Sequence, residues 1–174
     1  MINIKSRGIN LGERFPSNGY GDFQVIGYED KEKYLIRFLK TGYTLITNTW
    51  SIRTGKVRDK LQPSIQNFGF IGDGEYSSSS HPSIYKKWSR MIERVYGNHH
   101  PAYQDCTIST RWANFQNFAK DFITLPGYQE DLTGLHFDKD TIKPGNRTYA
   151  KEFCSLIPAS LNCSFVPRRG KRNY

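Results

Sequence analysis

The segment from residue 134 to residue 165 constrains the fold most, because apolar runs and turn residues alternate in it at short intervals. The apolar runs at residues 135–137 and 153–157 predict two strands. Between them, the sequence Lys-Pro-Gly-Asn at residues 143–146 predicts a turn, since proline fixes φ and glycine and asparagine tolerate positive φ. Pro158 suits the first position of a short helix. The expected order is therefore strand, loop, strand, helix.

Oxygen-bearing side chains stand at defined points of this segment. Asp138 and Asp140 end the first strand, and Asn162 is expected to project from the helix. Carboxylate and amide oxygens are ligands that suit Mg²⁺ or Mn²⁺. The sequence therefore predicts a site for one divalent cation. Because side chains alternate along a strand, the two acids are expected on one face and Lys139 on the other, unless the strand has already ended at Lys139.

The charge of the chain points to an anionic partner. The net charge is +9 over 174 residues, and from residue 143 onward there are seven basic residues and one acidic residue. Such a basic end favours double-stranded DNA as the partner, and the alternative is a basic domain with a disordered tail. The C-terminal residues expected to contact phosphates are Arg147, Arg168, Arg169, Lys171 and Arg172.

The cysteines and the N-terminal residues bear on the compartment. The chain has three cysteines, and residues 1–10 carry two basic residues without an apolar core. An odd number of cysteines without a signal peptide predicts a reducing, cytoplasmic setting. No apolar run reaches the length of a membrane span, so no membrane contact is expected. His99, His100 and Cys106 lack the second ligand pair that is typical of a structural zinc site.

The first part of the chain is rich in aromatic and β-branched residues. Residues 23–28, 34–39 and 43–49 are predicted to be strands of a small twisted sheet or a Tudor-like barrel. A basic loop follows at residues 53–60. Its side chains either contact a phosphate backbone or form a solvated hairpin tip. The DNA-contacting candidates of this loop are Arg53, Lys56 and Arg58.

A run of four serines at residues 77–80 is interpreted as a linker, because it has little to bury. It separates a β-rich module at residues 1–76, expected to bind DNA, from a second domain at residues 81–174. Apolar residues at helical spacing predict helices at residues 83–96 and 109–122 of that domain. The whole chain is therefore expected to belong to the α+β class.

The order of short motifs resembles phage-encoded HNH homing endonucleases over nearly the whole chain. The C-terminal motifs that carry the resemblance are Phe137-Asp138-Lys139-Asp140, Gly145-Asn146, Tyr149, Cys154, Ile157-Pro158 and Asn162. The upstream ones are Lys87-Trp88, Met91, Arg94 and Tyr96, then Trp112 with Phe115-Gln116-Asn117-Phe118. The N-terminal ones are Tyr20-Gly21-Asp22-Phe23, Arg37-Phe38, Thr41-Gly42-Tyr43 and Ile52-Arg53-Thr54-Gly55.

This resemblance implies a strand–strand–helix metal nuclease core that hydrolyses phosphodiester bonds in duplex DNA with Mg²⁺ or Mn²⁺. It also implies a phage protein in the cytoplasm of a bacterial host, without a small-molecule cofactor; we expect a monomer. Standard members carry a histidine directly after the first aspartate, where this chain has Lys139. The alternative is therefore a catalytically degenerate DNA-binding protein that acts as a phage regulator or accessory factor.

Each candidate catalytic residue has an expected role. Asp138, Asp140 and Asn162 are the candidate metal ligands. His136 is the candidate general base, because its ordinary pKa of about 6.5 suits proton abstraction, and a metal-bound water or another group is the alternative. Asn146 is expected to brace the loop. The candidate catalytic residues are His136, Asp138, Lys139, Asp140, Asn146 and Asn162.

Overall fold

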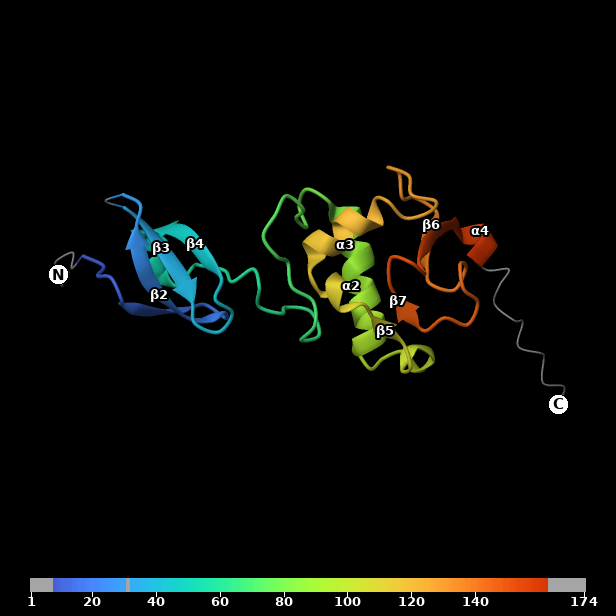
Figure 1. Cartoon of the computed structure of the whole chain (residues 1–174), viewed down its shortest axis with the longest axis horizontal. Coiled ribbons are helices and arrows are strands. Elements are labelled where there is room, and N and C mark those ends of the chain that lie inside the picture. The colour runs from blue at the N-terminus through green and yellow to red at the C-terminus, as the bar shows by residue number, and fades with distance from the viewer. Residues whose placement is uncertain (1–7, 31, 163–174) are drawn as a thin grey trace. The chain divides into compact units, whose positions relative to one another are not determined.

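The computed structural model describes residues 8–30 and 32–162, with the side chain of residue 162 outside the description. The chain divides into two compact units, Met1–Gln62 and Pro63–Tyr174 (Figure 1). Both helices and strands are present, in agreement with the expected mixed α and β composition. Among the described residues, no helix combines the length and the apolar character that crossing a bilayer requires.

The first unit is built on an antiparallel sheet of four strands in the order β1-β2-β3-β4. Alternation in β2 and β3 buries Phe23 and Val25 opposite Phe38 and Ile36, so one face of the sheet carries the core. The opposite face carries a polar row, in which Arg14, Gln24, Arg37 and Thr44 are neighbours across the four strands. The strands are β1 (Arg14–Ser17), β2 (Gly21–Tyr28), β3 (Lys33–Phe38) and β4 (Thr44–Asn48).

A short helix, α1 (Thr49–Thr54), follows the sheet. The Asn48 side chain caps it by accepting a hydrogen bond from the Ser51 amide at 2.8 Å, and Gly55 ends it with a φ of +66°. We expected residues 53–60 to form a loop throughout. Arg53 lies instead in the last turn of α1, because the asparagine cap and the left-handed glycine define a helix that the strand-like composition concealed.

The second unit is organised around the helices α2 (Pro82–Tyr96) and α3 (Phe115–Phe122). Apolar spacing predicted α2 correctly. The helix expected at residues 109–122 is broken, however, into a 3-10 turn, η2 (Thr110–Ala113), and α3. Asn114 is the reason, since its extended backbone interrupts the helix and its side chain accepts a hydrogen bond from the Gln116 amide at 2.9 Å. The largest fully buried side chains of this unit are Trp88, Trp112, Phe115, Phe118, Phe122 and Tyr149.

The boundary between the units lies between Gln62 and Pro63, and not at the serine run. Phe70 pairs with the start of α3, because its amide donates to Ala113 O at 2.8 Å and its carbonyl accepts from the Phe115 amide at 2.9 Å. The Gln116 side chain also donates to the Tyr76 carbonyl at 2.8 Å. Residues 63–76 therefore belong to the second unit, and residues 77–80 form a hydrogen-bonded turn before α2.

The described part of the segment at residues 134–165 has the expected order of strand, loop, strand and helix. β6 (Leu135–Asp138) pairs antiparallel with β8 (Ser155–Pro158), and α4 (Ala159–Asn162) follows directly. Pro158 ends β8, whereas we expected it to begin the helix. Two shorter strands, β5 (Thr107–Ile108) and β7 (Thr148–Tyr149), form a parallel pair. This second pair anchors the far end of the loop that leaves β6.

Asp121, on α3, connects this helix to η2 and to the segment between β7 and β8. It is buried, and its carboxylate accepts hydrogen bonds from Arg111 Nε at 2.7 Å and Trp112 Nε1 at 3.0 Å. Lys151, between β7 and β8, reaches the same carboxylate at 3.7 Å. Burial opposes the charged form, but the bonds from Arg111 and Trp112 outweigh it and lower the pKa of Asp121. The charged carboxylate on α3 is thus bonded to η2 and to the residues that precede β8.

Candidate active site

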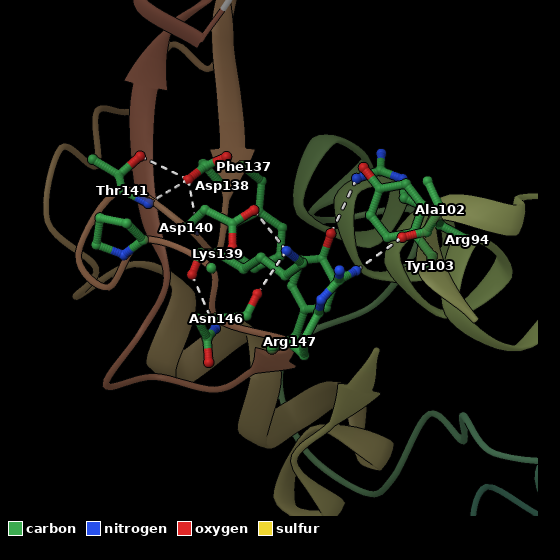
Figure 2. A pocket seen from close by; sticks show the side chains of 13 residues that line it. Arg94, Ala102, Tyr103, Phe137, Asp138, Lys139, Asp140, Thr141, Asn146 and Arg147 are labelled. Atoms are coloured by element: carbon green, nitrogen blue, oxygen red, sulfur yellow. Dashed lines mark hydrogen bonds and ion pairs between the residues drawn. The ribbon is translucent and has the colours of Figure 1, made fainter. Parts of the chain in front are cut away.

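A pocket with a volume of about 730 Å³ lies where β6 ends (Figure 2). One part of its wall is the loop that leaves β6, and another comes from α2 and from the 3-10 turn η1 (Pro101–Tyr103). Basic and acidic side chains share this wall. The charged residues that line the pocket are Arg94, Asp138, Lys139, Asp140 and Arg147.

Asp138 shapes the turn that follows β6. Its Oδ1 accepts hydrogen bonds from the Asp140 amide at 2.8 Å and from the Thr141 amide and hydroxyl, both at 2.7 Å. A carboxylate that accepts three bonds in this way fixes the backbone of the next residues. Since all three bonds go to Oδ1, Oδ2 is the oxygen of Asp138 that a ligand would meet.

Lys139 points into the pocket and is buried. Its Nζ donates to Asp140 Oδ2 at 2.6 Å and to Asn146 O at 2.9 Å. The expectation that Lys139 lies on the opposite face from the acids is wrong, because β6 ends at Asp138 and the alternation of a strand ends with it. Asp138, Lys139 and Asp140 therefore all line one pocket.

Asp140 carries an acceptor without a partner. Its Oδ2 is held by Lys139, whereas its Oδ1 is buried and accepts no hydrogen bond. A buried carboxylate oxygen normally has a partner, since leaving it unpaired is costly. This oxygen is therefore a candidate position for a cation or a donor from a ligand.

The Asn146 side chain bonds the backbone at both ends of the loop between β6 and β7. Its Nδ2 donates to Lys139 O at 3.0 Å and to Thr148 O at 2.6 Å, and its Oδ1 accepts from the Thr148 amide at 3.3 Å. These bonds join the two ends of the loop that carries the acids. They are the bracing expected of Asn146, whereas a direct part in chemistry stays a prediction.

Two pocket residues were missed as functional candidates, Arg94 and Tyr103. Arg94 Nη1 donates to the Tyr149 hydroxyl at 3.3 Å. Burial raises the pKa of Tyr149, so this hydroxyl stays protonated. Arg94 follows Met91 by three residues on α2, which places it beside the apolar face. That position, together with the place of Arg94 among the motifs of the resemblance, was the available signal.

Other predicted residues lie away from this pocket or outside the description. His136 is exposed on β6 and does not line the pocket, so its role as the base stays a prediction. In the first unit Arg53, Lys56 and Arg58 are exposed, and Lys56 Nζ lies 4.6 Å from the centre of the Trp50 ring. The predictions for the Asn162 side chain and for Arg168, Arg169, Lys171 and Arg172 fall outside the described residues.

The donor set fits a magnesium-type ion in part. Two carboxylates are the number that Mg²⁺ commonly takes from a protein, with phosphate and water oxygens in the remaining positions. Asp138 Oδ2 and the unpartnered Asp140 Oδ1 are the oxygens that would supply them. Over residues 8–30 and 32–162, no cluster of three or more His, Cys, Asp and Glu side chains is found.

No protein-family model, curated protein or solved structure matches this chain.

Proposed function

We propose that the second unit is a metal-dependent endonuclease that hydrolyses phosphodiester bonds in duplex DNA, as the resemblance to HNH homing endonucleases implies. The observation that carries the proposal is the pocket at the end of β6, where both acids of the Asp138-Lys139-Asp140 motif face three basic side chains. Acids alone would repel a phosphate. Acids beside cations suit a phosphate that is bridged by a divalent ion.

Each residue has a role in this proposal. Asp138 and Asp140 hold Mg²⁺ or Mn²⁺, and Asn162 is a further proposed ligand. When bound, that ion withdraws charge from the phosphate and from the leaving oxygen. Lys139 keeps Asp140 in place through its 2.6 Å ion pair. Arg147 contacts a phosphate, and His136 remains the proposed base.

The first unit is proposed to hold the duplex. Its exposed basic side chains at Arg53, Lys56 and Arg58 suit contacts to phosphates. Arg14 and Arg37 add two exposed guanidinium groups on the uncovered face of the sheet, in the row that runs across the strands. Arginine side chains on an uncovered face suit either phosphates or base edges.

A second candidate is a DNA-binding protein that does not cut. The observation that favours it is the ion pair between Lys139 and Asp140. The ammonium group already neutralises one carboxylate that a metal would need, at the position where standard relatives carry a histidine. In that case, the pocket would bind a phosphate without hydrolysing it.

Cleavage of supercoiled plasmid by the full chain with Mg²⁺, Mn²⁺ or EDTA tests the proposal. Asp138→Asn and Asp140→Asn are each expected to lower the cleavage rate by about 10²-fold or more, because the ion loses a charged ligand. DNA binding in EDTA should be unchanged or tighter, since a negative charge is removed beside the phosphates.

Asp131→Asn is the matched control, because Asp131 also accepts a backbone hydrogen bond in a turn but is exposed and lies outside the pocket. It should cut at the parent rate. Equal cutting by all of these variants would place the active site elsewhere. Binding without cleavage under any metal condition would favour the second candidate.

A further inference from the structure

Arg94 is held in a fixed orientation at the C-terminal end of α2. Its guanidinium carbon lies 5.2 Å from the centre of the Tyr103 ring, and its Nη1 donates to the Tyr149 hydroxyl at 3.3 Å. Two aromatic side chains from separate segments thus orient one guanidinium group. Burial opposes its charge, but the Tyr149 and Tyr103 side chains outweigh burial and leave the pKa of Arg94 above its usual value.

The charge of Arg94 has no carboxylate partner in the part of the chain that the structure describes. Of the nearby buried or pocket-lining acids, Asp121 pairs with Arg111 and Lys151, and Asp140 pairs with Lys139. The guanidinium group therefore stays positively charged, and it keeps N–H donors beyond the one bonded to Tyr149. An anion that entered the pocket would supply the counter-charge that the described carboxylates do not.

The surroundings of Arg94 favour a phosphate as that anion. Arg147 lines the same pocket, and its Nη1 donates to the carbonyl of Ala102, the neighbour of Tyr103, at 3.3 Å. In Figure 2, Arg94 and Tyr103 lie on one side of the view and Asp138 and Asp140 on the other. The planar fork of arginine matches two phosphate oxygens at once.

We propose that Arg94, together with Arg147, binds one phosphodiester group of a nucleic-acid backbone in this pocket and positions it opposite Asp138 and Asp140. The proposal rests on the proposed function for the identity of the polymer. It needs no metal and no cleavage, so it is testable when the chemistry is switched off.

Phosphate and DNA binding by the full chain in EDTA test this site. Arg94→Gln is compared with Arg90→Gln, which removes the same charge from an exposed position one turn earlier on α2. Inorganic phosphate is titrated by calorimetry, and a fluorescent 20-base-pair duplex by anisotropy. Arg94→Gln should weaken both affinities by about 10- to 100-fold, the effect of a charge-assisted hydrogen bond. Arg90→Gln should keep the phosphate affinity of the parent.

Two further variants separate binding from folding. Arg94→Lys keeps the charge but not the fork, so it should recover only part of the affinity. Arg147→Gln changes an exposed side chain and should also weaken phosphate binding, which keeps the proposal testable if Arg94→Gln unfolds. The melting temperature of each variant, measured without ligand, reports any loss of the bond to Tyr149.

Equal phosphate affinity in the parent, Arg94→Gln and Arg147→Gln would overturn the proposal. Loss of phosphate binding with unchanged duplex binding would also overturn it, since the site would then serve a free phosphate. Loss of both, in a protein that never cuts DNA, would support this site while contradicting the endonuclease.

Discussion

The Cys154 thiol is completely buried, and this burial raises its pKa from 9.0 to about 12. The folded protein therefore keeps the thiol neutral at pH values where the unfolded chain ionises it. The stabilisation is complete below pH 9 and is lost as the pH rises towards 12. Above pH 9, the free energy of unfolding should fall by up to about 1.4 kcal/mol per pH unit from this group.

Urea unfolding between pH 7.5 and 10.5, followed by the fluorescence of the buried Trp88 and Trp112, measures this slope. Cys154→Ala removes the titrating group, so its stability should depend less on pH over the same range. Tyr149 is present in both proteins, and burial, the main cause of its raised pKa, is the same in both. Equal slopes for the two proteins would contradict the assignment.

Single residues show where sequence reasoning succeeded and where it failed. Asn146 was identified from its turn sequence, since the turn is encoded by adjacent residues. The direction of Lys139 was not, because it depends on β6 ending at Asp138, and a strand end is a tertiary property. Arg94 was missed because its hydrogen-bond partner, Tyr149, lies 55 residues away in the sequence.

The turn before the hairpin controls the position of β8. Gly127 has a φ of +78°, and a Cβ there would lie 2.0 Å from the Leu156 carbonyl oxygen. Gly134 has a similar φ of +71° with no atom within 4 Å of that point. Gly134→Ala should cost about 1–2 kcal/mol from the backbone alone. Gly127→Ala should cost a further ~1–3 kcal/mol, because β8 has to move.

Urea unfolding at neutral pH measures both costs on the full chain. A loss of equal size in the two variants would show that Leu156 yields without cost. A larger loss in Gly127→Ala should come with slower cleavage, since β8 is the strand that pairs with β6 and its Asp138.

Elements differ in how far their sequences reveal them. The strands β2, β3 and β4 and the helix α2 follow from local alternation and apolar spacing, and each was predicted near its observed position. The parallel pair of β5 and β7 has two residues in each strand. No periodicity is visible in so short a run, and its pairing is set by the packing of the second unit. This pair anchors one end of the pocket loop, so the shape of the site was the least predictable part.

The division between Gln62 and Pro63 is testable with two fragments. A fragment of residues 63–174 keeps the bonds of Phe70 and Tyr76 to the region around α3, and a fragment of residues 81–174 loses them. Gly69, packed tightly against Trp88 and Ile92, is also lost in the shorter fragment. The shorter fragment should therefore be less stable by about 2 kcal/mol or more.

Thermal melting and amide chemical-shift dispersion distinguish the two fragments. Equal stability of the fragments 63–174 and 81–174 would show that the boundary lies at the serine run and that residues 63–80 are a linker. The complementary fragment, residues 1–62, is near the lower size limit for a chain that folds on its own.

The strand order of the first unit has a consequence for folding during synthesis. Its four strands pair only with their neighbours in sequence, whereas β5 pairs with β7, which lies 41 residues later in the chain. Local pairing is fast, and ribosomes add roughly 5–20 residues per second. The β1–β4 sheet therefore has time to form on the ribosome before β7 and β8 have been synthesised. For those seconds, the nascent chain carries a finished N-terminal sheet and no pocket.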